Sequence, residues 1–197
     1  MYRSFGKRLI GIFLSVCGLL VCGIPMLIIA ILIKLDSEGP ALFKQVRLGK
    51  NQKEFTIYKF RTMCNHAYEM GGVATRSDDY RITKIGAVLR RTSLDELPQM
   101  LNIIFGDMAI IGPRPILPVE FDDYTNNPRY CRRYDALPGM FCTVDIEYRS
   151  SSDRDLQFTM DADYVDHMSL ALDIKTFFGV IAPVVSGKNV YREEVKK

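Results

Sequence analysis

The sequence predicts a helix-rich mixed α/β fold with few short strands, preceded by one apolar N-terminal segment. Two alternating stretches predict strands, several periodic stretches predict helices, and no series of strand–helix–strand units indicates a parallel sheet. The 197 residues suffice for one domain with a sizeable core. A hydrophobic fraction of 48% and a net charge of +3 exclude a disordered chain, and only five cysteines exclude a disulfide scaffold.

The N-terminal segment is predicted to lie in a membrane. No charged residue occurs between Leu9 and Ile33. As a helix this run would be roughly 37 Å long, against roughly 30 Å for the hydrocarbon core of a bilayer. A secretory signal peptide fits poorly, because the run exceeds a usual apolar region and no small-residue cleavage site follows it. The segment also explains a mean hydropathy of +0.01 in a chain with 25% charged residues.

Pro25 leaves the topology of this segment open. A proline inside a helix lacks a backbone donor and kinks or breaks the helix. The segment is therefore either one kinked transmembrane helix, which its length favours, or a re-entrant hairpin that enters and leaves on one face. The basic flank Arg3, Lys7 and Arg8 is expected on the cytoplasmic side, so a span would place the rest of the chain outside and a hairpin inside. The five cysteines show no metal-ligand spacing and indicate reduced thiols, which favours the inside.

The polar part begins with two predicted strands. Residues 39–48 predict a short strand that ends in a turn, and residues 54–60 alternate enough for a second strand. Residues 64–82 are polar and contain glycine, which predicts a surface loop with a helical piece.

Helices are predicted before and after the Asp95–Glu96 pair. Residues 85–91 predict a short helix, and Ser93 with Glu96 three residues later has the pattern of a capping box. A second helix is expected from there to Gly106. Gly-Pro-Arg-Pro at 112–115 predicts a rigid turn.

The remaining residues predict more helix than strand. Residues 119–124 and 129–134 are expected to be helical, and residues 138–152 irregular. A long amphipathic helix is predicted over 161–182, before a polar tail that starts at residue 186.

Asp95 and Glu96 are the first candidates for chemistry. Two adjacent carboxylates at the start of a helix lie near its positive end, which favours the ionised form. They can share a divalent cation, or one can attack as a nucleophile while the other holds the metal. The alternative is structural, because acids are common in first turns as caps and dipole partners.

Isolated cations lie near this pair in the sequence. Lys59 follows a strand, Arg90 precedes the carboxylates, and Arg114 lies between two prolines. Planar guanidinium groups suit bidentate phosphate binding, so the set fits a small phosphorylated ligand with a metal ion; scattered surface cations are the alternative. Asp161 and Asp173 are weaker candidates for the same site. No arginine-rich stripe or nucleic-acid-binding motif occurs, so no nucleic-acid partner is expected.

Five motifs then follow one another along the chain: Lys-Phe-Arg-Thr-Met at 59–63, Leu-Arg-Arg-Thr-Ser-Leu-Asp-Glu-Leu-Pro-Gln at 89–99, Asn102, Gly-Asp-Met at 106–108 and Gly-Pro-Arg-Pro at 112–115. In this order they resemble the small monotopic phosphoglycosyl transferases, the bacterial initiating sugar transferases. Each motif alone is weak, whereas the ordered set is specific. The similarity covers nearly the whole chain, including the basic-then-apolar N-terminus with Pro25.

The resemblance implies a reaction and the residues that perform it. Such enzymes move a sugar 1-phosphate from a UDP-sugar to a polyprenyl (undecaprenyl) phosphate, release UMP and use Mg²⁺, as the first membrane step of glycoconjugate or polysaccharide synthesis. The phosphosugar is carried on the Asp of the dyad, here Asp95, with Glu96 beside it, and these two also match the metal ligands. The implied substrate-binding residues are Lys59, Arg90, Arg114, Arg149, Asp161 and Asp173.

The resemblance also implies an organisation that reverses the preference for a span. Residues 1–35 would be a re-entrant membrane helix broken at Pro25, and residues 36–197 a cytosolic catalytic domain with interfacial amphipathic helices. Both termini would lie on the cytoplasmic face of the bacterial inner membrane. Inner-membrane lipid is an implied partner, and formation of a homo-oligomer stays open.

Residues 138–149 depart from the usual family pattern Pro-Gly-Ile-Thr-Gly-x-Ala-Gln-Val-x-Gly-Arg. Here Phe141, Cys142, Asp145 and Tyr148 replace Thr, Gly, Gln and Gly. The loss of two glycines changes the backbone angles or the room available, and Asp adds a charge. Donor recognition is therefore expected to differ while the dyad is intact. Two other functions stay open: a metal-dependent phosphohydrolase with water as acceptor, and a non-catalytic membrane-bound scaffold.

Overall fold

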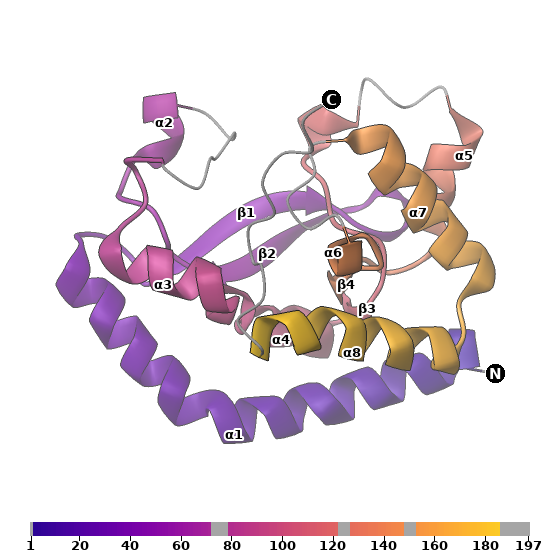
Figure 1. The fold of residues 1–197 in the computed structure, drawn as a ribbon, viewed down its shortest axis with the longest axis horizontal. Helices are drawn as coiled ribbons and strands as arrows, with labels where there is room; N and C mark the ends of the chain where they lie inside the picture. The colour runs from indigo at the N-terminus through magenta and orange to yellow at the C-terminus, as the bar shows by residue number, and fades with distance from the viewer. Residues whose placement is uncertain (1, 72–78, 122–126, 148–152, 186–197) are drawn as a thin grey trace.

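The computed structural model describes residues 2–71, 79–121, 127–147 and 153–185 (Figure 1). Its helices are α1 (Lys7–Asp36), α2 (Ala67–Gly71), α3 (Lys84–Thr92), α4 (Gln99–Phe105), α5 (Pro128–Cys131), α6 (Val144–Glu147), α7 (Arg154–His167) and α8 (Leu170–Val185). Its strands are β1 (Leu42–Leu48), β2 (Glu54–Phe60), β3 (Ala109–Ile111) and β4 (Gly139–Phe141). A π-helical turn, Tyr2–Gly6, precedes α1, and short 3₁₀ turns form at Lys50–Gln52, Leu94–Glu96, Pro118–Glu120 and Arg132–Asp135.

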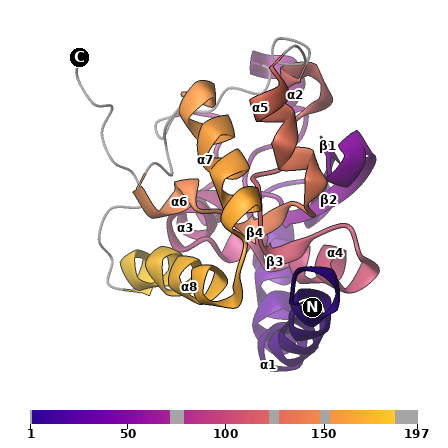
Figure 2. The same ribbon diagram turned by 90° about the vertical axis from the view of Figure 1, so that its right-hand side faces the viewer.

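The elements form two layers. Helix α1 runs along one edge of the molecule with α8 beside it, and Figure 2 shows the same two helices in the lower layer, under the strands and α7. β1 pairs with β2 antiparallel, from Leu42 opposite Phe60 to Leu48 opposite Glu54. β3 and β4 form a separate parallel pair. The helix-rich mixed fold with few short strands is thus confirmed for the described residues.

Asn102 connects α4 to the outer edge of the β1–β2 hairpin. Its side chain is fully buried. Its Oδ1 accepts a hydrogen bond from the Tyr58 backbone nitrogen at 3.0 Å, and its Nδ2 donates to the Thr56 carbonyl oxygen at 2.7 Å. These backbone groups lie on the edge of β2 that no other strand covers in the described chain. This side-chain amide therefore joins the free edge of β2 to α4 and fixes the position of α4 along the strand.

Arg61, just after β2, holds the C-terminal end of α1. Its side chain is buried, and its guanidinium donates to the carbonyl oxygens of Ile33, at 3.3 Å, of Ser37, at 2.7 Å, and of Glu38. A cation here adds hydrogen bonds to carbonyls at and just after the last turn and complements the negative end of the helix dipole. Ile29 and Ile33 of α1 pack against Phe60 beside it.

The N-terminal end of α1 is held by the same domain. Arg8 donates to the carbonyl oxygens of Ile103 and Ile104 at the C-terminal end of α4. Lys7 bonds Asp173 on α8 and Tyr164 on α7. Both ends of α1 are thus attached to one folded unit.

Helix α1 is continuous, and the break predicted at Pro25 is not observed. Pro25 lies inside the helix, which Figure 1 shows bent near the middle of its length. Proline cannot donate to the carbonyl four residues earlier, which permits a bend without ending the helix. By its 30 residues and composition, α1 is long and apolar enough to cross a membrane.

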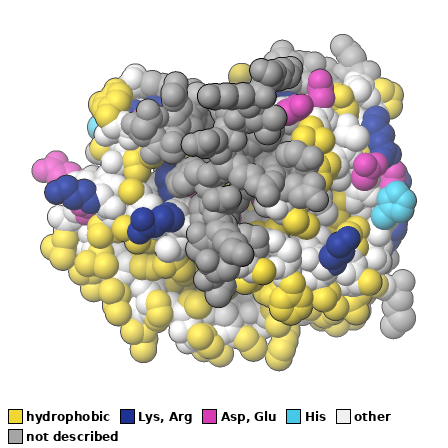
Figure 3. All heavy atoms as spheres, in the orientation of Figure 1, with side chains coloured by type: hydrophobic (Ala, Val, Ile, Leu, Met, Phe, Trp, Pro, Cys, Tyr) yellow, Lys and Arg dark blue, Asp and Glu magenta, His cyan; other side chains and the backbone are white. Residues whose placement is uncertain are grey.

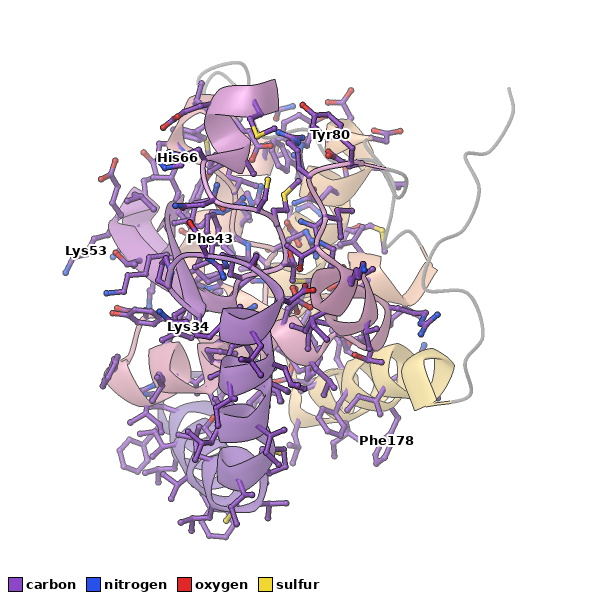
Figure 4. All side chains as sticks on the ribbon, turned by 90° about the vertical axis from the view of Figure 1, so that its left-hand side faces the viewer. Lys34, Phe43, Lys53, His66, Tyr80 and Phe178 are labelled. Atoms are coloured by element: carbon purple, nitrogen blue, oxygen red, sulfur yellow. The ribbon has the colours of Figure 1, made fainter. Side chains whose placement is uncertain are left out.

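Exposed apolar side chains extend this surface beyond α1. Phe105 at the end of α4 and Phe178 on α8 are about two-thirds exposed, at 65% and 64%. Figure 3 shows the hydrophobic side chains gathered along the lower edge, over α1 and α8. In Figure 4, Phe178 points away from the body of the domain. The apolar surface therefore spans helices that are distant in the sequence.

Most predicted elements of the polar part are confirmed, and the bounds or type of three of them are corrected. The two strands and the helix over 85–91 are found as β1, β2 and α3, and residues 129–134 are helical. The long helix expected over 161–182 is two helices, α7 and α8, separated at Met168 and Ser169. The helix expected from Ser93 to Gly106 is interrupted at Pro98. The predicted polar tail from residue 186 lies outside the described residues.

The third correction concerns residues 138–152, which are predicted to be irregular but contain both β4 and α6. A three-residue strand is too short for an alternation pattern to register. What forms it is a close backbone approach: a Cβ on Gly139 would lie 2.1 Å from the Gly112 nitrogen, so only glycine permits the pairing with β3. The partner strand is distant in the sequence, and no local pattern indicates it.

We expect Asn102→Ala to lower the free energy of unfolding by about 2–4 kcal/mol, because it leaves the partly buried Tyr58 nitrogen and Thr56 oxygen without partners and empties a fully buried site. Chemical denaturation of the detergent-solubilised protein measures this. Asn65→Ala, which removes an exposed amide, is the control and should change stability by under about 0.5 kcal/mol. Equal stability of the two variants would contradict the role of Asn102.

Candidate active site

The Asp95–Glu96 pair lies on a tight turn between two helices. α3 ends at Thr92, and Ser93 adopts a left-handed conformation (φ 60°) that turns the chain into the 3₁₀ turn Leu94–Glu96. Ser93 makes no side-chain capping hydrogen bond, so the predicted capping box is wrong. Pro98 directly precedes α4. The dyad is therefore presented by a short connection whose two ends are fixed by helices.

The start of α3 is pressed against the end of β2, which brings the dyad to the strand. A Cβ on Gly86 would lie 2.0 Å from the Thr62 carbonyl oxygen, so this contact requires glycine. Arg90, one turn later, donates from Nε to Thr62 Oγ1 at 2.8 Å. The backbone of α3 can therefore approach Thr62 this closely only because residue 86 is glycine.

Lys59 reaches the dyad from β2. Its Nζ lies 2.7 Å from Glu96 Oε1, and the two side chains are 26% and 17% exposed. The pair is partly buried, and the positive charge of Lys59 also acts on the neighbouring Asp95. Lys59, Arg90 and Glu96 all act on the carboxyl group of Asp95.

The pKa of Asp95 is raised from an ordinary value of 3.8 to about 6. Burial is the largest cause and the negative charge of Glu96 the second, while Lys59 and Arg90 oppose the rise. At neutral pH the carboxylate is still ionised, but it is less stabilised than an ordinary aspartate. Such a group is a better base and nucleophile, and raised acid pKa values of this origin are typical of active sites.

Arg114 is held at three points. Its backbone nitrogen donates to Asp161 Oδ1 at 3.3 Å, its carbonyl oxygen accepts from Arg133, and its Nη1 donates to Asp145 Oδ1 at 2.8 Å. Its side chain is 40% exposed, whereas that of Asp145 is 6% exposed. Asp145 is itself fixed, because its other oxygen accepts from the Cys142 nitrogen at 3.1 Å. Asp145 therefore orients a guanidinium that still faces solvent, and it raises the pKa of Arg114.

Asp161 lies behind Arg114 in the protein interior. It is fully buried, and its Oδ2 lies 2.8 Å from Arg133 Nη2, also buried. Burial raises the pKa of Asp161 to about 6, and the cation of Arg133 opposes the rise. The contacts of Asp161 position the turn that carries Arg114.

Asp173 occupies a different cluster. Its carboxylate accepts from Tyr164 at 2.6 Å and from Tyr2 at 2.5 Å and pairs with Lys7. These contacts fasten the beginning of α1 to α8. The structure thus brings together Lys59, Arg90, Asp95, Glu96 and Arg114 and places Asp161 and Asp173 in supporting positions; Arg149 lies outside the described residues.

A family model described as "Bacterial sugar transferase" matches residues 2–187 of the chain. The chain belongs to this family. It is 40% identical, over 92% of its length, to the exopolysaccharide production protein PSS of Rhizobium leguminosarum bv. phaseoli and covers 96% of that protein. It is 38% identical, over 85% of its length, to a UDP-glucose:undecaprenyl-phosphate glucose-1-phosphate transferase of Caulobacter vibrioides, of which it covers 65%.

A further relative is considerably longer than this sugar transferase. The UDP-N-acetylgalactosamine-undecaprenyl-phosphate N-acetylgalactosaminephosphotransferase of Aeromonas hydrophila is 35% identical over 93% of the chain, which spans 44% of that protein. Relatives thus include one of about the same length and others in which the matching region is only part of the protein.

The dyad of this sugar transferase supplies too few ligands to hold a divalent cation by itself, so a bound substrate would have to supply the others. The described residues contain no group of three or more His, Cys, Asp or Glu side chains suited to a metal. Mg²⁺, however, is commonly bound by one or two carboxylates together with substrate phosphates. The mutual repulsion of Asp95 and Glu96, which raises the Asp95 pKa, is the kind of unbalanced charge that a cation relieves.

Sequence reasoning missed several residues that shape the site. Asp145 was noted only as a departure from the family pattern, and its contact with Arg114 depends on α6 packing near the 112–115 turn. No sequence pattern distinguishes Arg133 from its neighbour Arg132. Arg133 is buried, whereas Arg132 is exposed and pairs with Asp166 on the surface. Arg61 lies within a family motif but serves the end of α1.

Asp95→Asn is expected to stabilise the fold at neutral pH. The raised pKa means that ionised Asp95 costs the folded state free energy, which the neutral amide removes; the gain is about 1–3 kcal/mol near pH 7. As the pH falls below about 4, Asp95 is protonated in both folded and unfolded chains and the gain disappears. Denaturation with a chelator present, across this pH range, measures it.

Asp155→Asn serves as the control for this comparison, because Asp155 is an exposed carboxylate on α7. It should show no comparable gain as the pH rises. An Asp95→Asn variant that is less stable than the parent protein at neutral pH would contradict the electrostatic description of the dyad.

Proposed function

We propose that the chain is a membrane-bound phosphoglycosyl transferase that moves a sugar 1-phosphate from a UDP-sugar to a polyprenyl phosphate and releases UMP. The observation that carries this is the Asp95–Glu96 pair set among three cations, Lys59, Arg90 and Arg114, in a member of the bacterial sugar transferase family. Relatives named for UDP-sugar donors and undecaprenyl phosphate acceptors support the substrate classes. The product would be the first lipid-linked sugar of a polysaccharide.

Asp95 is the nucleophile in this proposal. Its carboxylate oxygen attacks the phosphorus that bears the sugar; the bond to the UMP oxygen breaks and UMP leaves with the electron pair. An oxygen of the polyprenyl phosphate then attacks the same phosphorus and releases the carboxylate. Covalent catalysis lets a soluble donor and a lipid acceptor use one site in turn.

The surrounding cations act on the charge of the reacting groups. A carboxylate and a diphosphate repel each other, and Lys59, Arg90 and the fixed Arg114 offset this repulsion. Because Asp145 and the backbone contacts orient Arg114 before a ligand arrives, little reorganisation is needed on binding. Asp145 stands where the family usually has Gln, so donor preference is expected to depend on this pair.

Asp95 and Glu96 would also hold Mg²⁺, completed by phosphate oxygens of the donor. When bound, the ion supplies positive charge to the diphosphate. The residues of the chain retain separate tasks: Lys59 holds Glu96 in place, and Arg114 binds phosphate oxygens.

The attachment of both ends of α1 to one domain supports a re-entrant, monotopic helix. Arg61 holds the C-terminal end and Arg8 the N-terminal end. A helix that crossed the bilayer would place its ends on opposite faces, roughly 30 Å of hydrocarbon apart, and one domain could not hold both. The basic N-terminal flank favours the cytoplasmic face of the inner membrane, where UDP-sugars are made.

Incubation of the purified protein with a UDP-sugar panel, without acceptor, tests the chemistry. We expect one equivalent of UMP and a phosphosugar adduct on Asp95 by mass spectrometry, followed by transfer on addition of polyprenyl phosphate. Asp95→Asn should lose at least about 10³-fold in turnover while staying folded, whereas Asp155→Asn should retain activity.

The alternatives give different outcomes in this experiment. Full turnover by Asp95→Asn would overturn the proposed nucleophile. Sugar phosphate that appears in water even when acceptor is present would identify a phosphohydrolase. No UMP release from any donor by the folded protein would indicate a non-catalytic scaffold.

The topology has its own test in intact cells. Cysteines introduced at Arg3 and at Lys53, which extends from the end of the β1–β2 hairpin in Figure 4, should both resist a membrane-impermeant thiol reagent until the cells are opened. Labelling of Lys53→Cys alone from outside would mean that α1 spans the membrane.

A further inference from the structure

A cavity of about 340 Å³ lies where the first turns of α1 meet the domain, away from the dyad. Arg3, Lys7 and Arg8 line it from the N-terminal side, and Lys50 and Arg132 from the domain. Its apolar wall includes Ile103, Met108, Val165 and Met168. The cavity thus combines cations with an apolar floor.

Two of the five cations that line this cavity are already paired, Lys7 with Asp173 and Arg132 with Asp135 and Asp166. Asp135 is the one acidic side chain that lines it among the described residues. Arg3 and Arg8 donate to backbone carbonyl oxygens, which carry no net charge, and in the described chain no carboxylate pairs with them or with Lys50. Positive charge is therefore left for an anionic ligand.

The place of the cavity along α1 identifies the source of that anion. Arg3, Lys7 and Arg8 directly precede the uncharged run that starts at Leu9, so the cavity lies at the level where the chain passes from polar to apolar surroundings. In a bilayer this is the level of lipid head groups. The wall residue Gly11 belongs to the first turns inside the apolar run.

The cavity is separate from the proposed reaction site. It lies at the C-terminal end of α4, where Arg8 contacts Ile103, whereas the dyad precedes the N-terminal end of that seven-residue helix. The length of α4 places roughly 10 Å between the two ends. None of Lys59, Arg90, Asp95, Glu96 or Arg114 lines the cavity.

We propose that this cavity binds the phosphate head group of an anionic membrane phospholipid, which joins the N-terminal end of α1 to the domain. The volume is near the lower end of the roughly 300–1,000 Å³ of ligand pockets, which suits a head group but not two acyl chains. The chains would follow exposed side chains of α1 such as Phe13. The proposal rests on the membrane attachment proposed above, but not on the reaction.

Two pairs of variants test this site. At Gly11 an added Cβ would lie 3.5 Å from Ile103 Cγ2, an ordinary contact, so Gly11→Ala keeps the cavity while the larger side chain of Gly11→Leu fills it. Lys50→Gln removes a cation from the lining, and Lys53→Gln removes an exposed lysine that does not line it. The second pair changes only the surface and keeps the test valid if Gly11→Leu does not fold.

The full-length protein is reconstituted into nanodiscs of phosphatidylcholine with and without phosphatidylglycerol, and retained lipid is measured by native mass spectrometry. We expect one retained phosphatidylglycerol for the parent protein and Gly11→Ala, and none for Gly11→Leu. Lys50→Gln should bind phosphatidylglycerol about five-fold more weakly, and Lys53→Gln as the parent protein does.

Several results would overturn the proposal. These are equal retention by both members of each pair, no preference for phosphatidylglycerol over phosphatidylcholine, or displacement of the lipid by free inorganic phosphate. Displacement by polyprenyl phosphate at equimolar amounts would make the cavity an acceptor site instead. UMP release, measured on the same samples, separates the two proposals: its absence with lipid retained contradicts the proposed reaction alone.

Discussion

Two arginines fasten the ends of α1 to the same folded unit, and much of the architecture depends on this. Arg61 binds the carbonyls that end α1, and Arg8 of α1 binds the carbonyls that end α4. Each places a cation at the negative, C-terminal end of a helix. The apolar middle of α1 is thereby held along one edge of the domain, where Gly18 lies against Met100 of α4. The position of α1 along this edge is thus fixed relative to the rest of the domain.

The candidate active site is joined to the same frame. Arg61 and Thr62 directly follow β2. The Thr62 backbone contacts Gly86 of α3, and its side chain accepts a hydrogen bond from Arg90 of the same helix. The dyad follows α3 directly. From the other side, Asn102 ties α4 to β2. The carboxylates thus lie between two elements that also hold α1. A reaction on a lipid phosphate needs this connection between the dyad and α1, because the reacting groups must stay at a fixed distance from the apolar surface.

Local patterns account for much of the fold and for the central part of the site. Alternation predicted β1 and β2, and the apolar run predicted α1. Motif order pointed to Lys59, Arg90, Asp95, Glu96 and Arg114, which the structure brings together. Prediction failed where distant contacts decide conformation. Pairing with β3 makes a strand of Gly139–Phe141, which no local pattern indicates.

The sequence by itself determined which residue types are present, where the chain is apolar, and to which family it belongs. These follow from composition, periodicity and motif order, which are local properties. Only the tertiary structure decided that Asp145 orients Arg114, that Asp161 lies buried behind the turn, and that Arg8 and Arg61 hold opposite ends of one helix. The reason is physical: burial and charge pairing depend on neighbours that are distant along the chain, and the same carboxylate becomes a nucleophile or a support according to what packs around it.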